Sequence, residues 1–306
     1  MRQYLKRRLL TLIPVIFGVV TAVFLIIHLI PGDPVAMMLE ENARPGDVEA
    51  LRSRLGLDQP LWVQYGKFWG NLFQGDLGES IYQRQAVFRL IMERFPNTAL
   101  LSVCAVIVSL IIAFPLGIFS ALNQRKPVDY LSLGFSILGI SMPVFWLGPL
   151  LILLFAVQLH WLPVTGLGSW KHLVLPSFTL GFGLSAITIR MIRSSMIEVM
   201  NQDYIRTAFA KGLSKKRVVW KHALKNVMIP VITIVGLQLG ALFGGVIITE
   251  KVFSYPGIGS LLITAIKGRD YPLVQGVILI IALTYIAINL FVDLIYSQVD
   301  PRIKLE

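Results

Sequence analysis

Six stretches of the chain carry almost no charged side chains over about 20 residues or more, and they limit its fold more than any other feature. A helix that rises ~1.5 Å per residue needs about 20 residues to cross ~30 Å of hydrocarbon. The stretches lie near residues 9–30, 97–122, 130–158, 173–197, 228–249 and 272–295. The sequence therefore predicts an all-α polytopic membrane protein with six transmembrane helices.

The composition agrees with this prediction. Hydrophobic residues make up 55% of the chain and charged residues 15%, which leaves too little polar surface to cover a soluble globule. The single cysteine, Cys104, excludes a disulfide within the chain. The first apolar stretch follows four basic residues, but its length and the lack of an Ala-x-Ala pattern favour a retained signal anchor over a cleaved signal peptide.

The distribution of charge predicts the orientation of the helices. The N-terminus, the 123–129 loop, residues 190–228 and the C-terminal tail hold 17 of the 28 Lys and Arg residues but five of the 17 acidic residues. By the positive-inside rule, this side and both termini are expected in the cytoplasm. The net charge of +11 is then a topology signal, and we do not expect nucleic-acid binding.

The pattern divides the chain into three parts. Residues 1–30 form an N-terminal segment and the first transmembrane helix, residues 31–95 an extracytoplasmic cap, and residues 96–306 a core with the other five. Within the cap, apolar residues between Val48 and Leu55 recur at helical spacing, and a broader aromatic face runs from Trp62 to Phe73. These aromatic residues either pack on one another and at the lipid interface, or help receive an external protein.

A basic segment at 198–228 separates the fourth and fifth apolar stretches. Asn201 and Ser214 are of the type that caps helix N-termini, and Gly212 suits the left-handed residue that ends a helix. The segment therefore predicts a helical hairpin on the charged side of the membrane.

Two features of this hairpin need an explanation. Ala208, Ala210 and Gly212 are small, which permits close approach of another backbone or a groove. The cations at 215–217 fall in a helical first turn, where the helix dipole disfavours each of them by ~0.3–1 kcal/mol. Topogenic charge or contact with anionic lipid is one explanation for these cations, and a docking partner is the other.

The segment Arg206-Thr207-Ala208-Phe209-Ala210-Lys211-Gly212 is similar to the Glu-Ala-Ala-x-x-x-Gly loop of binding-protein-dependent ABC importer permeases. Further segments resemble the branch of that family that comprises dipeptide, oligopeptide, nickel and glutathione permeases. They are Pro31-Gly32-Asp33-Pro34, Gly75-Asp76-Leu77-Gly78, Phe95-Pro96-Asn97-Thr98, and residues 55–60, 142–148, 222–226, 250–259, 269–272 and 300–302. They cover nearly the whole chain in order.

This resemblance implies a type I ABC importer permease fold in a bacterial or archaeal cytoplasmic membrane. It implies that the loop is a coupling helix that seats in a cleft of an ATP-hydrolysing subunit. The residues that carry this role are then Arg206, Thr207, Ala208, Ala210, Lys211, Gly212 and Leu213. The chain departs from the family pattern in two places, with Arg206 where Glu is usual and Leu224-Lys225 where Leu-Pro is usual.

The resemblance also implies partners. They are a second, related permease subunit, two ATP-binding subunits that carry ATP and Mg²⁺, an extracytoplasmic substrate-binding protein, and membrane lipid. No cofactor or metal is expected in this chain itself. Transport by alternating access follows from such an assembly.

The fifth apolar stretch holds small residues at every fourth position, Gly236, Gly240 and Gly244. They serve helix packing within the chain, or contact with the second permease across the central path. Gln238 is polar in the middle of this stretch, so Gln238, Gly240 and Gly244 are candidates for the translocation path. Downstream, Glu250, Tyr255, Pro256 and Gly257 are candidates for a loop at the outer mouth.

Other functions find less support. The chain has no Gly-x-x-x-x-Gly-Lys-Ser/Thr loop and no His-Glu-x-x-His motif, so we expect no enzyme activity of its own. A serine protease built on Ser141 and His28 has no further support. An ion-coupled secondary transporter is the alternative of a different class, but no internal repeat is visible. For the substrate, the sequence favours short peptides, with nickel, glutathione or another small solute as alternatives.

Overall fold

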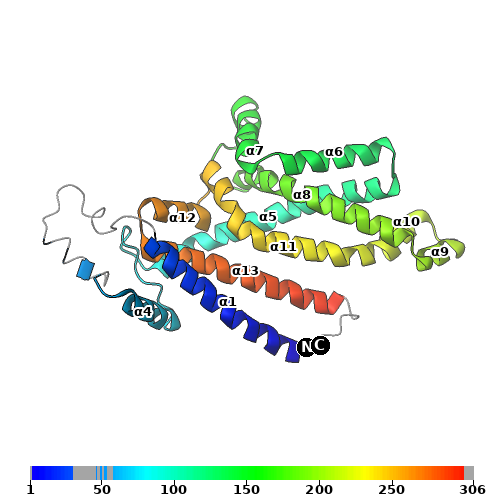
Figure 1. The fold of residues 1–306 in the computed structure, drawn as a ribbon. Helices are drawn as coiled ribbons and strands as arrows, with labels where there is room; N and C mark the ends of the chain where they lie inside the picture. The colour runs from blue at the N-terminus through cyan, green and yellow to red at the C-terminus, as the bar shows by residue number, and fades with distance from the viewer. Residues whose placement is uncertain (1, 30–45, 47–48, 50–51, 54–57, 300–306) are drawn as a thin grey trace.

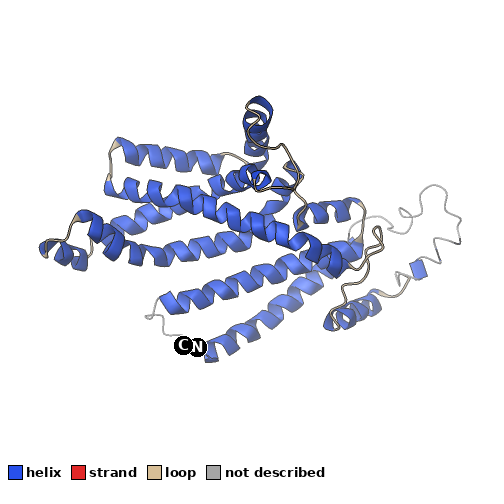
Figure 2. Ribbon diagram, turned by 180° about the vertical axis from the view of Figure 1, so that it is seen from behind, coloured by secondary structure: helices blue, strands red, loops and turns tan. Residues whose placement is uncertain are grey.

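The computed structural model describes residues 2–29, 46, 49, 52–53 and 58–299, and the secondary structure of this part is helical (Figures 1 and 2). One antiparallel bridge, between Glu79 and Ala86, is the β pairing in these residues. The elements are α1 (Arg2–Leu29), α4 (Leu61–Phe73), α5 (Val87–Leu122), α6 (Pro127–Ser141), α7 (Val144–Leu151), the π-helical η1 (Ile152–Gln158), α8 (Lys171–Met200), α9 (Asp203–Ala210), α10 (Lys215–Arg217), the π-helical η2 (Val218–Ala223), α11 (Leu224–Val252), α12 (Ile258–Lys267) and α13 (Tyr271–Val299).

Four of the described helices are long and apolar enough to cross a membrane, and a bent pair of helices makes a possible fifth. The four continuous spans lie in α5, α8, the α10–η2–α11 run and α13, where four of the six predicted stretches fall. In α1 the apolar part is Leu10–Leu25, which is shorter than the other spans. The polytopic all-α prediction is confirmed, and the count of six spans stays a prediction.

The predicted span at 130–158 is not one straight helix. It consists of α6 and the α7–η1 run, which meet at an angle of 104°. The break falls at Met142, whose backbone is extended (ψ 111°), directly before Pro143. Because the proline ring disfavours the α conformation of the residue before it, helix α6 ends there. The apolar pattern alone carried no signal for this bend.

Among the described elements, α5 and α8 form the most extensive contact. Glycines allow their approach, since a Cβ on Gly117 would lie 2.8 Å from Cβ of Ile192, and one on Gly181 would lie 2.7 Å from the carbonyl oxygen of Ala105. Helices α6 and α11 pack on α8, and α11 packs on α13. The bundle is therefore organised around a tight α5–α8 pair.

The two ends of the bundle carry different elements (Figure 1). The α9–α10 hairpin, the start of α1 and the end of α13 lie at one end, which we call the basic end, and α12 and the start of α13 lie at the other, the outer end. That the basic end faces the cytoplasm rests on the positive-inside rule.

The aromatic side of α4 packs on α1. Trp69 stacks on Phe17 with ring centroids 5.5 Å apart, and the Tyr65 hydroxyl lies 2.7 Å from that of Thr21. Most of these aromatic residues therefore contact the first helix, although Trp62 stays exposed. The predicted helix between Val48 and Leu55 and the turn at 31–34 lie largely outside the described residues.

The glycine contacts of α8 generate a matched pair of substitutions. Ala in place of Gly normally stabilises a helix by about 0.5–1 kcal/mol. We expect this gain for Gly183→Ala, where the nearest atom to a new Cβ is 3.7 Å away. Gly181→Ala should instead destabilise the protein by about 1–3 kcal/mol, because its Cβ overpacks the α5 backbone. The unfolding temperature of the purified protein in detergent checks this, and equal shifts for both variants would contradict the packing.

Candidate functional site

The first helix of the hairpin at the basic end is terminated by a left-handed glycine, as predicted. Gly212 has φ +76°, and its N–H donates to the carbonyl of Phe209 at 2.9 Å. The N–H of Leu213 donates to the carbonyl of Ala208 at 3.3 Å. These two bonds form a Schellman motif, which ends α9 and turns the chain toward α10.

The start of the hairpin differs from the prediction. Asn201 does not cap α9, because it is the C-cap residue directly after α8 and its side-chain amide donates to the carbonyl of Ile197 at 3.0 Å. Gln202 occupies the N-cap position instead, and its side chain makes no capping bond. Ser214 stands at the N-cap of α10, likewise without a side-chain bond.

An apolar core joins the hairpin to the transmembrane helices. Ile205 and Ala208 of α9 and Val218 and Val219 of η2 are buried in one cluster with the last turns of α5 and α8 and the start of α11. Well-packed interiors transmit displacement because they contain few voids. Helix α9 therefore shares one packed core with three membrane helices.

The outward side of the hairpin carries polar side chains with aromatic side chains among them. Arg206, Thr207, Ala210, Lys211 and Gly212 are exposed, and Leu213 is partly buried. Ala208 points into the protein's own core, so its small size serves internal packing rather than an outer small-residue face.

Three large rings also remain exposed on the hairpin. They belong to Tyr204, Phe209 and Trp220. Apolar surface of this kind, rimmed by cations, is typical of contact sites.

An ion pair between a partly buried arginine and a buried aspartate braces the bundle just behind the hairpin. Arg193 of α8 donates from Nε and Nη2 to the two carboxylate oxygens of Asp129 at 2.7 and 2.9 Å. The same carboxylate accepts from the Ser120 hydroxyl at 2.5 Å and from the Arg125 N–H at 2.9 Å. This pair ties the α5–α6 turn to α8. Arg193 therefore points toward Asp129 within the bundle, although a long cationic side chain near a helix end could also reach the lipid headgroups.

At the outer end, the buried carboxylate of Glu250 organises the predicted outer loop. Its Oε1 accepts from the Thr98 hydroxyl at 2.5 Å, and its Oε2 accepts from the Ser260 N–H at 2.8 Å. The N–H of Ile258 in turn donates to the Thr98 oxygen at 2.9 Å. The carboxylate of Glu250 on α11 therefore accepts a hydrogen bond from a backbone N–H in the first turn of α12. A negative charge at this helix N-terminus is also favoured by the helix dipole.

The other predicted outer-loop residues surround this carboxylate. A Cβ on Gly257 would lie 2.0 Å from Oε1 of Glu250, so glycine is required there. The Pro256 carbonyl accepts from the Asn97 side chain at 2.8 Å. Tyr255 is fully buried, and burial, aided by the charge of Glu250, raises the pKa of its phenol to about 12. The structure brings Glu250, Tyr255, Pro256 and Gly257 together.

A second buried carboxylate lies nearby. Asp270 accepts from the Ser80 hydroxyl, from the Ile81 N–H at 3.1 Å and from the Leu273 N–H at 3.3 Å. It thus fixes the 80–83 turn to the first turn of α13. In the sequence, Asp270 lies directly before an apolar stretch and within the family-like segment at 269–272.

The path candidates lie on different faces of α11. Gln238 donates to the Leu184 carbonyl at 3.1 Å and accepts from the Thr188 hydroxyl at 3.3 Å, so it bonds to α8. A Cβ on Gly240 would contact the Tyr285 ring at 3.1 Å, while one on Gly244 would meet no atom within 4 Å. Of the three, Gly244 has open space beside it, and a role of any of them in the path stays a prediction.

Comparison with known proteins identifies this arrangement. The family model described as the binding-protein-dependent transport system inner membrane component matches residues 113–305, and its N-terminal counterpart matches residues 1–102. The chain therefore belongs to the family of inner-membrane components of binding-protein-dependent transport systems. It is a multi-pass permease component of an ABC importer in the bacterial inner membrane.

Individual relatives match over nearly the full length. The chain is 46% identical to the dipeptide transport system permease protein DppB of Alkalihalophilus pseudofirmus, over 99% of this chain and 100% of that one. It is 44% identical to the glutathione transport system permease protein GsiC of Escherichia coli K12, over 99% of each.

A solved structure shows the same fold. An inward-facing structure of the MetNI methionine ABC transporter matches with a TM-score of 0.60 at 16% identity, over 69% of this chain and 96% of that one. The predicted type I importer fold is thus confirmed.

The buried ion pair yields a prediction with an internal control. In a double-mutant cycle of Asp129→Asn and Arg193→Gln, we expect a coupling energy above about 1 kcal/mol, because each single change leaves a buried group without its partner. The exposed pair Arg89–Glu93, whose side chains are 73% and 53% exposed, should give at most about 0.5 kcal/mol. Unfolding by SDS titration in mixed micelles measures both, and equal coupling energies would contradict the bracing role.

The outer carboxylate yields another prediction. Glu250→Gln should destabilise the protein by about 1–3 kcal/mol, because an amide cannot accept from both Thr98 and the α12 backbone. Lys251→Gln, one residue along on the exposed side, should have no effect beyond about 0.5 kcal/mol. Thermal unfolding of the purified complex separates the two variants, and a stable Glu250→Gln protein would show that the bonds to Glu250 contribute little.

Proposed function

We propose that the chain is the permease subunit of an ATP-driven importer that moves short peptides by alternating access. The observation that carries this proposal is the continuous core that joins the exposed α9 hairpin to α5, α8 and α11. Movement of a partner against α9 would reach the membrane helices through that core.

The proposed assembly contains a second homologous permease, two ATP-binding subunits with ATP and Mg²⁺, and an extracytoplasmic binding protein. The family description, a component of binding-protein-dependent transport systems, supports the binding protein as a partner. Arg206, Thr207, Ala210, Lys211 and Gly212 form the proposed contact with an ATP-binding subunit, because they are exposed together on the outer side of the hairpin. Ala208 and Leu213 support that surface from beneath.

The proposed translocation path runs beside α11, with the outer loop around Glu250 near its extracytoplasmic mouth. Gly244 marks the side of α11 that has free space. Short peptides are the proposed substrates because one relative is a dipeptide permease, and another is a permease for glutathione, itself a tripeptide. An ion-coupled secondary transporter is not favoured by these comparisons.

The hairpin offers a test with a closely matched control. Gly212 (φ +76°) and Gly75 (φ +75°) each end a helix with the same pair of backbone bonds, and a Cβ would meet no atom at either. Arg at either position introduces the same backbone strain. Gly212→Arg should abolish co-purification of the ATP-binding subunits and reduce dipeptide uptake into proteoliposomes at least tenfold, because it fills the contact surface. Gly75→Arg, at the other end, should leave co-purification unchanged.

The outcomes separate the two parts of the proposal. Normal co-purification and uptake with Gly212→Arg would contradict the coupling role of the hairpin. ATP-dependent uptake of another solute, but not of dipeptides, by the unaltered complex would contradict the peptide assignment alone.

A further inference from the structure

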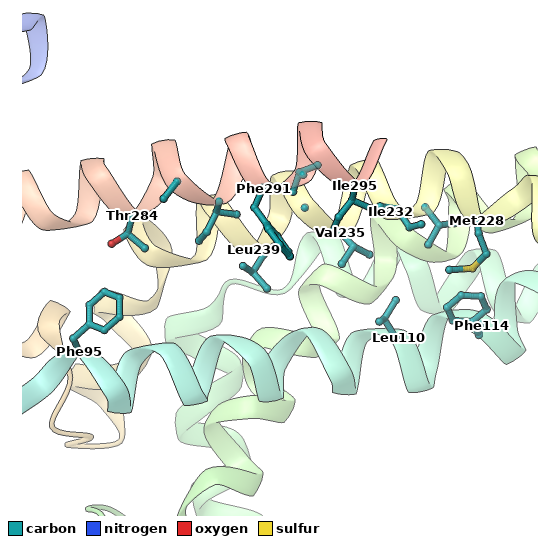
Figure 3. Close-up of a pocket in the computed structure, with 15 residues that line it drawn as sticks. Phe95, Leu110, Phe114, Met228, Ile232, Val235, Leu239, Thr284, Phe291 and Ile295 are labelled. Carbon is teal, nitrogen blue, oxygen red and sulfur yellow. The ribbon is translucent and has the colours of Figure 1, made fainter. Parts of the chain in front are cut away.

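An apolar groove runs along the membrane helices between α5, α11 and α13 (Figure 3). Its volume is about 500 Å³, a size typical of small-molecule sites. Phe95 lies at one end, and Met228 and Phe114 lie at the other, toward the basic end (Figure 3). Along α11 the lining runs from Met228 to Leu239, a length of about 16 Å at the rise of an α-helix.

The lining limits what the groove can hold. Of its 15 residues, Thr284 alone has a polar side chain, and its hydroxyl already donates to the Ile280 carbonyl at 2.7 Å. A peptide or another polar solute would lose its hydrogen bonds to water here without replacement, which costs several kcal/mol for each group. The groove is therefore unsuited to the transported peptide and suited to a hydrocarbon chain.

A cation stands where the groove meets the basic end. Lys225 is exposed and precedes Met228 and Ile232 by three and seven residues, so the three share one face of α11. Trp220, which is 59% exposed, lies one to two turns further on, and exposed tryptophans mark the level of the lipid headgroups. Lys225 thus stands near the headgroup level, in line with a groove that extends into the hydrocarbon.

We propose that this groove binds an anionic phospholipid of the leaflet at the basic end, with one acyl chain along α11 and its phosphate at Lys225. The acyl chain fits the apolar lining, and the negative headgroup fits the lysine. This inference does not depend on the identity of the transported solute.

Site-specific crosslinking tests the occupant directly. The photoreactive amino acid p-benzoylphenylalanine, placed at Ile232 in the assembled complex, should capture phospholipid after extensive detergent washing. The same probe at Leu131, which is 74% exposed on α6 and not part of the groove, should lose its lipid during washing. Mass spectrometry of the crosslinked chain identifies the adduct. An adduct with another polypeptide at Ile232 would overturn the proposal, because the groove would then be a subunit interface.

Substitutions test the two halves of the site. Val235→Trp should fill the groove and remove most of the co-purified phosphatidylglycerol, whereas Leu237→Trp, exposed on another side of the same helix, should not. Lys225→Gln should lower the ratio of retained phosphatidylglycerol to phosphatidylethanolamine about fivefold, the strength of one cation at an anionic surface. Lys251→Gln, at the outer end of α11, is its control.

Two results of these substitutions would contradict the proposal. Unchanged lipid retention with Val235→Trp, in a protein with unchanged thermal stability, would overturn the acyl-chain site. An unchanged lipid ratio with Lys225→Gln would overturn the selectivity for an anionic headgroup.

Discussion

The contact between α5 and α8 is the constraint on which the rest of this structure depends. Glycines let the two helices approach so closely that an added Cβ would meet the facing backbone or side chains at below 3 Å. In a membrane, where hydrocarbon competes with every apolar side chain, close packing of this kind is a main source of helix association. The hairpin, the ion pair and the outer loop all attach to one of these two helices or to both.

The buried carboxylates of the bundle have the same kinds of hydrogen-bond partners. Each of the three buried carboxylates, on Asp129, Glu250 and Asp270, bonds to backbone N–H groups and to a hydroxyl. Burial of a charge is costly unless every acceptor is satisfied. Their partners belong to different elements of the chain, so each carboxylate specifies how a loop sits on a helix. The apolar contacts bring the helices together, and the carboxylates set where the loops lie.

Much of this arrangement was predictable from the sequence. Runs of uncharged residues located four continuous spans, because length and hydropathy are local properties. Gly212 predicted the end of α9 for the same reason, since the left-handed conformation is a preference of glycine itself. The proposed coupling role of the hairpin came from the family resemblance, because no local pattern indicates it.

Two features that escaped prediction depend on contacts between residues far apart in the sequence, and a third is local. Arg193 could reach solvent or a carboxylate, and only the fold shows that Asp129 lies within reach. The small side chain of Ala208 is compatible with an interface or with a core, and in the structure it is packed in the core. The bend at Pro143 is local, but one proline inside an apolar run is compatible with both a kinked and a broken helix.

The two carboxylates of the outer end also bear on how the molecule can move. Glu250 links α11 to α5 and α12, while Asp270 links α13 to the turn that leads into α5. These four helices and the turn are thus joined to one another at the outer end of the bundle. A widening of that end which parted these elements would break the hydrogen bonds of both buried carboxyl groups. We therefore expect the outer ends of these helices to move together, and an opening for a solute at this end to form beside this group of helices and not between its members.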